Sequence, residues 1–380
     1  ESLRRGTACR APTDTTGPMA GPPRKDTVGD RLLLSGNEAI ALGAYEAGVT
    51  LAAGYPGTPS SEILESIAEY EGLYAEWSVN EAVALEVASG ASLTGARSLV
   101  AMKHVGLNVA SDPLLTLSYT GVGGGLVVVS ADDPGIHSSQ NEQDNRHYAR
   151  LAKIPMLEPA DSQEAKDFVG LALDISERFD TPVLLRITTR VAHSKSLVRR
   201  GAVRPPPRPG DPARDAPKYV MVPANARVRH QWVEERLERL RRYSERTPLN
   251  HLIPGNKSLG IVASGVAYQY AREEFPQASF LKLGMTYPVP LRKIAQFARQ
   301  VKRLHVVEEL DPFLEDEIAA AGIPLKRRHR RFYVGELNPD RVREMISGRA
   351  STPSAKRSPK AHALPARGPV MCPGCPHRGV

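Results

Sequence analysis

The stretch GLVVVS at residues 125–130, continued by ADDPGIH at residues 131–137, decides the fold that we expect for this chain. Its apolar residues run without interruption, which is typical of a strand buried on both faces of a parallel sheet. Strand-like and helical stretches alternate on either side of it. The strands are expected at residues 49–54, 75–78, 97–103 and 183–190, and the helices at residues 37–46, 59–70, 80–93 and 109–120. This alternation predicts an α/β domain whose parallel sheet is flanked by helices.

A second α/β pattern follows a break in the sequence. After Lys195 the chain becomes rich in arginine and proline, which predicts a linker. Residues 224–246 form a charged helix with Val233, Leu237 and Leu240 on one stripe, and we expect that stripe to pack on a domain rather than bind a ligand. Further strands are expected at residues 259–264, 279–283 and 303–308, and helices at residues 266–274 and 293–301.

Composition narrows the class of protein. The 380 residues are 41% hydrophobic, which is enough for two domains with cores of their own. The three cysteines, Cys9, Cys372 and Cys375, are too few for the disulfide framework of a small secreted protein. The longest strongly apolar run is about ten residues, whereas a membrane-spanning helix needs about 20. We therefore expect a cytoplasmic globular protein without a membrane anchor.

The net charge of +8 comes from two segments. Residues 198–247 hold 13 Lys and Arg against 6 Asp and Glu, and residues 321–371 hold 12 against 3, so the remainder of the chain is net acidic. The basic run at residues 326–331 raises the alternative of a nucleic-acid-binding protein. No aromatic stacking platform accompanies this run, and a solvated edge explains it more simply.

Three loops that follow expected strands combine polar residues with glycine. They are residues 55–62, 103–108 and 131–137. Loops at the carboxyl ends of neighbouring parallel strands converge on one crevice, where we expect a binding site. In the first loop Thr58, Ser60 and Ser61 either bind an anion at a helix N-terminus or simply cap the helix. His104 and His137, in the other two loops, are either catalytic or structural.

Glu81 begins the helix expected at residues 80–93. A carboxylate at this place can serve only to offset the helix dipole. Glu86 lies off the helix face that Glu81 occupies, so the two residues need not share a role. The local pattern therefore leaves both a structural and a catalytic interpretation of Glu81 open.

These motifs together resemble one family, the large alpha subunits of the indolepyruvate ferredoxin oxidoreductases, within the 2-oxoacid ferredoxin oxidoreductases. The string DDPGIHSSQNEQD at residues 132–144 is especially specific. The resemblance covers about residues 32–380. The matching segments are residues 35–39, 55–62, 80–81, 103–108, 131–146, 263–267 and 372–378.

The resemblance implies a series of domains characteristic of thiamine diphosphate enzymes. The expected divisions are a disordered N-terminus at 1–31, a pyrimidine-binding domain at 32–197, a linker and charged helix at 198–248, a domain similar to the C-terminal domain of transketolase at 249–347, a second linker at 348–371 and the start of a truncated diphosphate-binding domain at 372–380. Met19 is a possible start of translation.

The resemblance also implies roles for individual residues. Glu81 matches the glutamate that hydrogen-bonds the aminopyrimidine ring of thiamine diphosphate and activates the cofactor. Tyr55, Pro56 and Asn108 are further cofactor-binding candidates. The candidates for substrate binding are Thr58, toward the substrate carboxylate, Gly57, which would widen the pocket for an aromatic ring, and His104.

The implied activity is oxidative decarboxylation of indolepyruvate or another aryl pyruvate to an acyl-CoA, with ferredoxin as the electron acceptor. It requires thiamine diphosphate with magnesium, coenzyme A as cosubstrate, iron–sulfur clusters and a beta subunit, in a dimer of heterodimers. Cys372 and Cys375 are possible cluster ligands in the full-length protein and free thiols in this fragment, which we expect to be inactive alone. A non-oxidative thiamine diphosphate enzyme, a decarboxylase or a transketolase-like protein, is the alternative.

Overall fold

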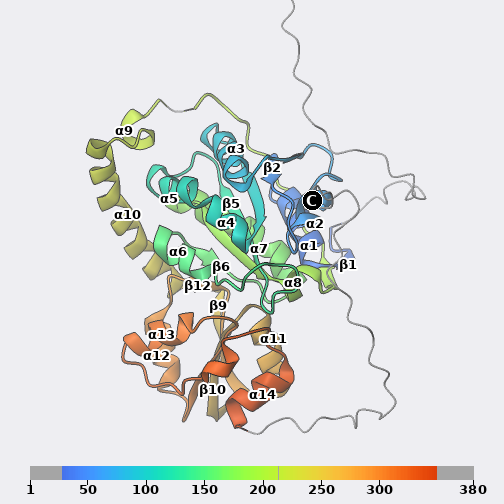
Figure 1. Cartoon of the computed structure of the whole chain (residues 1–380), viewed down its shortest axis with the longest axis vertical. Coiled ribbons are helices and arrows are strands. Elements are labelled where there is room, and N and C mark those ends of the chain that lie inside the picture. Colours follow the sequence, from blue (N-terminus) through green and yellow to red (C-terminus); the bar gives the residue numbers. More distant parts are fainter. Residues whose placement is uncertain (1–27, 213, 349–380) are drawn as a thin grey trace, which may run out of the picture.

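A computed structural model describes residues 28–212 and 214–348 of the chain. These residues form two layered α/β units, one below the other in Figure 1. The expected α/β class with a parallel sheet is confirmed. Several sequence-based expectations lie outside the described residues, namely Met19, the second linker beyond Gly348, and the start of a further domain with Cys372 and Cys375.

The larger sheet has seven strands. Their order across the sheet is β12-β6-β7-β5-β4-β2-β3, and all neighbours are parallel except β12 and β6. The bounds are β2 Leu51–Gly54, β3 Tyr74–Trp77, β4 Ser98–Lys103, β5 Leu126–Asp132, β6 Met156–Leu157, β7 Val183–Thr188 and β12 Met285–Tyr287. Strand β5, which contains residues 126–130 of the GLVVVS stretch, lies between β4 and β7 and is buried along its whole length.

Helices cover both faces of this sheet because the side chains of β5 alternate between two cores. Val127 and Val129 belong to one core, with α1, α2 and α7, whereas Leu126 and Val128 belong to the other, with α3, α4, α5 and α6. The bounds are α1 Gly36–Glu46, α2 Ser61–Ile67, α3 Glu81–Leu93, α4 His104–Val109, α5 Ser111–Thr120, α6 Arg146–Ala152, α7 Ser162–Phe179 and α8 Thr189–His193.

The structure corrects the sequence-based elements in several places. A helix, α4, begins at His104 directly after β4, where we expected a loop, and α2 ends at Ile67 rather than at Tyr70. Strand β1 (Arg31–Leu34) begins within the segment expected to be disordered up to residue 31. It pairs antiparallel with β8 (Ser196–Arg199), which continues past the boundary expected at residue 197. Strands β1 and β8 form a separate two-stranded sheet outside the alternating α/β pattern, so the local sequence does not identify them.

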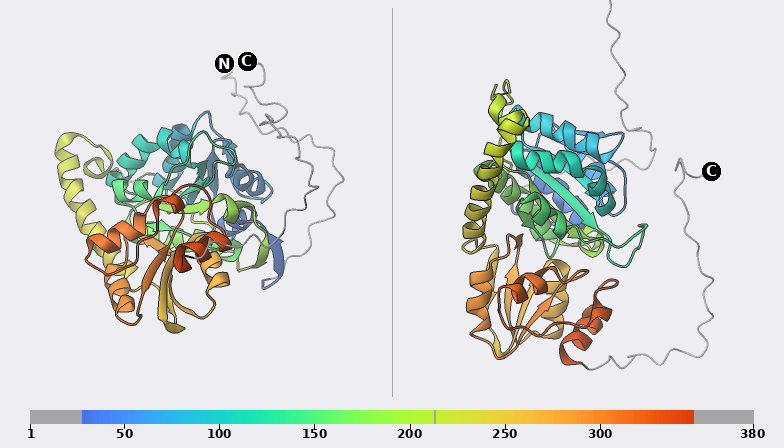
Figure 2. Two further views of the ribbon diagram at one scale, coloured as in Figure 1. Left: turned by 60° about the horizontal axis from the view of Figure 1, so that its bottom comes forward. Right: turned by 60° about the vertical axis from the view of Figure 1, so that its left-hand side comes forward.

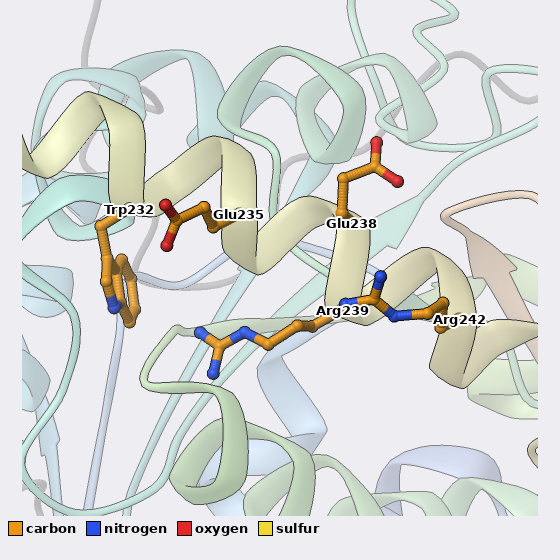
Figure 3. Close-up of a pocket in the computed structure, with 5 residues that line it drawn as sticks. All are labelled: Trp232, Glu235, Glu238, Arg239 and Arg242. Atoms are coloured by element: carbon orange, nitrogen blue, oxygen red, sulfur yellow. The ribbon is translucent and has the colours of Figure 1, made fainter.

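The connection between the two units contains α9 (Ala216–Tyr219) and α10 (Pro223–Ser244). Helix α10 runs along one side of the molecule (Figures 1 and 2). Val233, Leu237 and Leu240 are buried, which confirms that the stripe packs on the fold. The outer face of α10 carries Trp232 beside a shallow hollow of about 460 Å³ lined only by side chains of this helix (Figure 3).

The smaller sheet has four strands in the order β13-β10-β11-β9. The bounds in this unit are β9 Asn250–Ile253, β10 Asn256–Ser264, α11 Gly265–Glu274, β11 Ala278–Leu283, α12 Leu291–Ala298, β13 Leu304–Val307, α13 Phe313–Ala320, a 3₁₀ turn at Arg330–Phe332 and α14 Pro339–Ser347. Strand β12, which follows β11, leaves this unit and pairs with β6 of the larger sheet. The two units are therefore joined by shared sheet structure, which the division at residues 248 and 249 did not anticipate.

A buried network of charges joins the two units. Arg146, on α6, donates hydrogen bonds to the Asp144 carboxylate, to the Glu308 carboxylate after β13, and to the Glu309 and Asp311 carbonyl oxygens. All three charged side chains of this group are about 1% exposed. Burial alone would raise the pKa of Asp144, but the neighbouring charges of Arg146 and Arg186 hold it well below its usual range.

Arg186 extends the network on the sheet side. Its Nε donates to Asp132 Oδ2 at 2.7 Å, and its Nη1 donates to Glu158 Oε2 at 3.1 Å. Glu158 in turn accepts hydrogen bonds from Thr286 of β12 and Ser264 of β10. Charged and polar side chains of both units therefore take part in the same hydrogen-bond network. Within the described residues, no helix combines the length and apolar character needed to cross a bilayer.

We expect Arg146→Met to destabilise the protein by about 3–5 kcal/mol, because it leaves the carboxylates of Asp144 and Glu308 buried without their counter-charge. Arg150, on the same helix, forms an ion pair with Glu317 and is about half exposed. Arg150→Met is therefore the matched control and should cost less than about 1 kcal/mol. Chemical denaturation of the two variants measures the difference, and equal losses would show that the buried network is not a major source of stability.

Glu309 gives a prediction about pH. Burial raises the pKa of this carboxyl from 4.5 to about 7. The stability that the protonated group contributes is present below the unfolded-state value of 4.5 and is lost as the pH rises through about 7. We expect Glu309→Gln, which keeps an acceptor for the Leu337 amide, to gain up to about 3 kcal/mol over the natural protein between pH 4 and pH 8.

Thermal unfolding of both proteins across this pH range provides the measurement. Glu65→Gln, at an exposed position of α2, is the control and should leave the pH dependence unchanged. A constant difference between Glu309→Gln and the natural protein at all pH values would contradict an elevated pKa at Glu309.

Candidate functional site

The turn after β2, the end of β4 and the loop after β5 meet at the carboxyl edge of the larger sheet, where the sequence predicted a crevice. Ser138, from the loop after β5, donates its hydroxyl to the Thr58 carbonyl oxygen at 3.2 Å. Lys103, at the end of β4, donates from Nζ to the Ser138 carbonyl oxygen at 3.1 Å. The turn after β2, the end of β4 and the loop after β5 therefore meet around Ser138.

Glu81 stands at the start of α3, which follows β3 on the same edge of the sheet. Asn80 caps the helix by accepting a hydrogen bond from the Val83 amide at 2.9 Å, and this fixes where the helix begins. Glu81 is 9% exposed. Within the part of the chain that the structure describes, its carboxylate forms no hydrogen bond and no ion pair. A nearly buried carboxylate without a partner in its own chain is suited to bind a group from outside.

Gly106 shapes the space that the Glu81 side chain occupies. A Cβ atom on this glycine of α4 would lie 2.5 Å from Glu81 Oε1, 2.7 Å from its Cγ and 2.9 Å from its Cδ. These distances are too short for any side chain, so glycine at this position allows α4 to pack directly against the carboxylate. Gly106 lies in the motif at residues 103–108, but the local sequence contains no signal for this contact.

Lys103 is the basic residue beside this carboxylate. Burial lowers the pKa of its ammonium, and the negative charges of Asp133 and Glu81 act in the opposite direction. Its aliphatic chain lies under Gly57, where a Cβ atom would be 2.9 Å from Lys103 Cδ. A side chain at Gly57 would therefore have to displace the lysine.

In the turn after β2, the hydroxyl groups of both serines form hydrogen bonds within the turn. Ser60 donates to the Gly57 carbonyl oxygen, and the Gly57 amide donates to the Ser61 hydroxyl, both at 2.8 Å. Ser60 is buried, and the Thr58–Pro59 peptide bond is cis. These contacts favour the structural interpretation of Ser60 and Ser61. The exposed residues of the turn are Tyr55, Pro56 and Thr58.

His104 lies away from solvent, and its side chain is fully buried. Its Nε2 is 3.2 Å from the Asn141 carbonyl oxygen, and its own carbonyl oxygen accepts a hydrogen bond from Asn145. The histidine therefore anchors the loop after β5, and a ligand could reach the ring only if this loop opened. His137, the other histidine considered, lies 3.5 Å from Glu336 of the smaller unit.

Asn108 is exposed and is held by side chains of the loop after β5 and of α6. It exchanges two hydrogen bonds with the Gln143 side chain and accepts a third from the Tyr148 hydroxyl. These residues border a hollow of about 630 Å³ that reaches Asp311 in the smaller unit. Asn108 is thus placed at a surface between the two units.

The motif at residues 131–146 has two separate functions in the fold. Its ends, Asp132, Asp144 and Arg146, belong to the buried charge network, whereas its middle carries Ser138 to the candidate site. No periodic pattern marks the buried charges in the sequence, because ionised residues in a polar loop look like surface residues.

Comparison with known proteins adds a family assignment. Residues 42–223 match the family described as pyruvate flavodoxin/ferredoxin oxidoreductase, thiamine diphosphate-binding. The chain is 46% identical over 369 residues to indolepyruvate oxidoreductase subunit IorA of Methanothermobacter thermautotrophicus and 42% identical over 384 residues to that of Archaeoglobus fulgidus. Both matches cover 93% of this chain and 60% of the relative, so the chain spans about 60% of the length of these relatives.

A solved structure supports the fold. The 2-oxoglutarate:ferredoxin oxidoreductase from Magnetococcus marinus, with 2-oxoglutarate, coenzyme A and succinyl-CoA bound, superposes with a TM-score of 0.65. The match covers 77% of this chain and 60% of that chain, at 18% sequence identity. At this identity the similarity concerns the arrangement of helices and strands.

The contact between Gly106 and Glu81 can be tested by a double-mutant cycle. We expect Gly106→Ala to destabilise the protein by about 1–3 kcal/mol, because the added methyl group displaces the Glu81 carboxylate. In a Glu81→Ala background the same change should cost at least about 1 kcal/mol less. Chemical denaturation of the single and double variants measures this coupling.

Gly90, on the outer side of α3, provides the matched control. A Cβ atom there meets nothing within 4 Å, so Gly90→Ala should be neutral or slightly stabilising. Additive effects of Gly106→Ala and Glu81→Ala would contradict the proposed contact.

Proposed function

Because the chain is a homologue of the indolepyruvate oxidoreductase IorA subunits and carries a thiamine diphosphate-binding domain of the pyruvate flavodoxin/ferredoxin oxidoreductase family, we propose that it is part of a 2-oxoacid ferredoxin oxidoreductase. The proposed reaction is oxidative decarboxylation of indolepyruvate or another aryl pyruvate to an acyl-CoA. The observation that carries the proposal is Glu81, a nearly buried carboxylate without a partner in the described chain, at the carboxyl edge of the parallel sheet.

The residues around Glu81 fit the pyrimidine end of thiamine diphosphate. Gly106 leaves the carboxylate a space that any side chain would fill. Glu81 would hold a proton at the ring nitrogen of the aminopyrimidine, a task for a carboxyl group that is shielded from water. When bound, the cofactor supplies the electron sink for loss of carbon dioxide from a 2-oxoacid.

The remaining candidate residues are assigned to substrate or cofactor binding. We propose that Thr58, exposed on its turn, donates its hydroxyl to the substrate carboxylate, while Tyr55 and Pro56 line the cofactor side. Gly57 has a second effect beyond widening the pocket, because its lack of a side chain leaves room for Lys103. Asn108 would contact the cofactor from α4, and His104 would act on substrate only through the loop that covers it.

The proposal includes components that this chain does not provide by itself. Residues 32–197 would form the pyrimidine-binding domain, and residues 249–347 the domain similar to the C-terminal domain of transketolase. The diphosphate and magnesium would bind a further domain, and Cys372 and Cys375 would join later cysteines as cluster ligands. The complete enzyme would be a cytoplasmic dimer of heterodimers with a beta subunit, and would use coenzyme A and ferredoxin.

The alternatives receive less support. A non-oxidative thiamine diphosphate enzyme would share the role of Glu81, but the two relatives described above carry the name oxidoreductase. Nucleic-acid binding is disfavoured because the basic run at residues 326–331 is largely neutralised. Arg327 pairs with Asp316, Arg331 pairs with Glu344, and Arg328 is buried near Glu315.

We expect Glu81→Gln to lower kcat for indolepyruvate-dependent ferredoxin reduction by at least about 100-fold, because glutamine keeps the shape of the side chain but cannot exchange the proton. The assay uses the full-length subunit together with its partner. Glu86→Gln is the matched control, since Glu86 is exposed on the same helix. Full activity of the Glu81→Gln enzyme would contradict the assignment.

A further inference from the structure

Lys103 occupies a position from which it can act on a ligand of the candidate site. It is the last residue of β4 and precedes the first turn of α4, so it stands on the same sheet edge as Glu81. Its side chain reaches between the loop after β2 and the loop after β5. Lys103 therefore lies where these two loops meet the end of β4.

The side chain of Lys103 is held along most of its length. Gly57 covers the aliphatic part, as the distances of 2.9 Å to Cδ and 3.2 Å to Cγ from a Cβ built on Gly57 indicate. Among the described residues, the ammonium donates one hydrogen bond, to the Ser138 carbonyl oxygen. An ammonium group has three N–H donors, so two remain for other partners.

The charge of Lys103 lacks the close counter-charge that several other shielded cations have. Within residues 28–212 and 214–348, no carboxylate oxygen lies within 4.0 Å of its Nζ. Arg146, Arg186 and Lys166, by contrast, each have a carboxylate at 3.1 Å or less. A half-buried cation without a close partner is costly unless a ligand supplies the negative charge.

Asp133, the nearest candidate for a counter-charge in its own loop, is committed elsewhere. Its Oδ2 accepts hydrogen bonds from the Ser138 amide and the Ser139 hydroxyl, and its Oδ1 accepts one from the Thr189 hydroxyl. Asp133 thus stabilises the loop that presents Ser138. It acts on the Lys103 ammonium only through its charge at a distance, and it leaves N–H donors of the ammonium for an external anion.

We propose that the Lys103 ammonium binds the carboxylate of the 2-oxoacid substrate, next to Thr58. The inference rests on the proposed function. Ser138 holds both residues, because it accepts from Lys103 Nζ and donates to the Thr58 carbonyl oxygen. A carboxylate has two oxygens, and the ammonium and the Thr58 hydroxyl can each donate to one of them.

The rival role for Lys103 is to position Glu81 by its charge. The two roles give different kinetic results. A residue that binds the carboxylate changes KM and selects for charged ligands, whereas a residue that acts through Glu81 changes kcat and the pH profile.

The test uses the full-length subunit with its partner and three variants. In Lys103→Met, which keeps the length of the side chain but removes the charge, we expect KM for indolepyruvate to rise roughly 10- to 100-fold. Lys103→Arg should return KM to within about fivefold of the natural enzyme, because the charge is restored. Lys153→Met is the control, since Lys153 pairs with Glu234 on the outside of α6 and α10.

Binding of two inhibitors of the same shape gives a readout independent of turnover. Lys103→Met should bind 3-indolepropionate more weakly by the same factor as the change in KM, while its affinity for the uncharged 3-indolepropanamide stays the same. A lower kcat with unchanged KM and unchanged preference for the carboxylate would overturn the inference in favour of the rival role. An equal loss of affinity for both inhibitors in Lys103→Met, with no recovery of affinity in Lys103→Arg, would overturn it as well.

Failure of the inference and failure of the proposed function are distinguishable. A natural complex that reduces no ferredoxin with any 2-oxoacid contradicts the function. An active natural complex whose Lys103→Met variant keeps its KM and its preference for the carboxylate inhibitor contradicts only the role of Lys103.

Discussion

Arg146 reaches from α6 of the larger unit to Glu308 of the smaller one, and both the junction of the two units and the loop that presents Ser138 depend on this contact. The guanidinium satisfies two carboxylates and two carbonyl oxygens in a region closed to water. A buried arrangement of this kind is stable only when every partner is in place, so it fixes the relative position of the two units closely. Hydrophobic packing alone would allow more variation in that position.

The same network fixes the geometry of the candidate site. The loop after β5 begins at Asp132, which is bound to Arg186, and ends at Asp144 and Arg146. Between these anchored ends, Ser138 is presented to Thr58 and Lys103. The buried charge network does not contact a ligand, but it thus determines the positions of the residues that face one.

The sequence predicted the parallel sheet well because β5 and its neighbours have strong, uninterrupted apolar patterns. It also predicted that the segments at the carboxyl ends of β2, β4 and β5 converge, because neighbouring parallel strands bring these ends together. The short strands β1, β6 and β12 escaped because pairing rather than local pattern defines them. The contact between Gly106 and Glu81 and the commitment of Ser60 and Ser61 to their own turn depend on distances between loops, which local spacing does not specify.

The exchange of β12 between units has a consequence for synthesis of the chain. Strand β6 is complete once residue 157 has left the ribosome, but its outer neighbour, at residues 285–287, is made more than a hundred residues later. During that interval the edge of the larger sheet is open, and open edges favour pairing with other chains. Vectorial synthesis therefore makes the nascent larger unit dependent on shielding, by chaperones or by its own helices, until the smaller unit closes the edge.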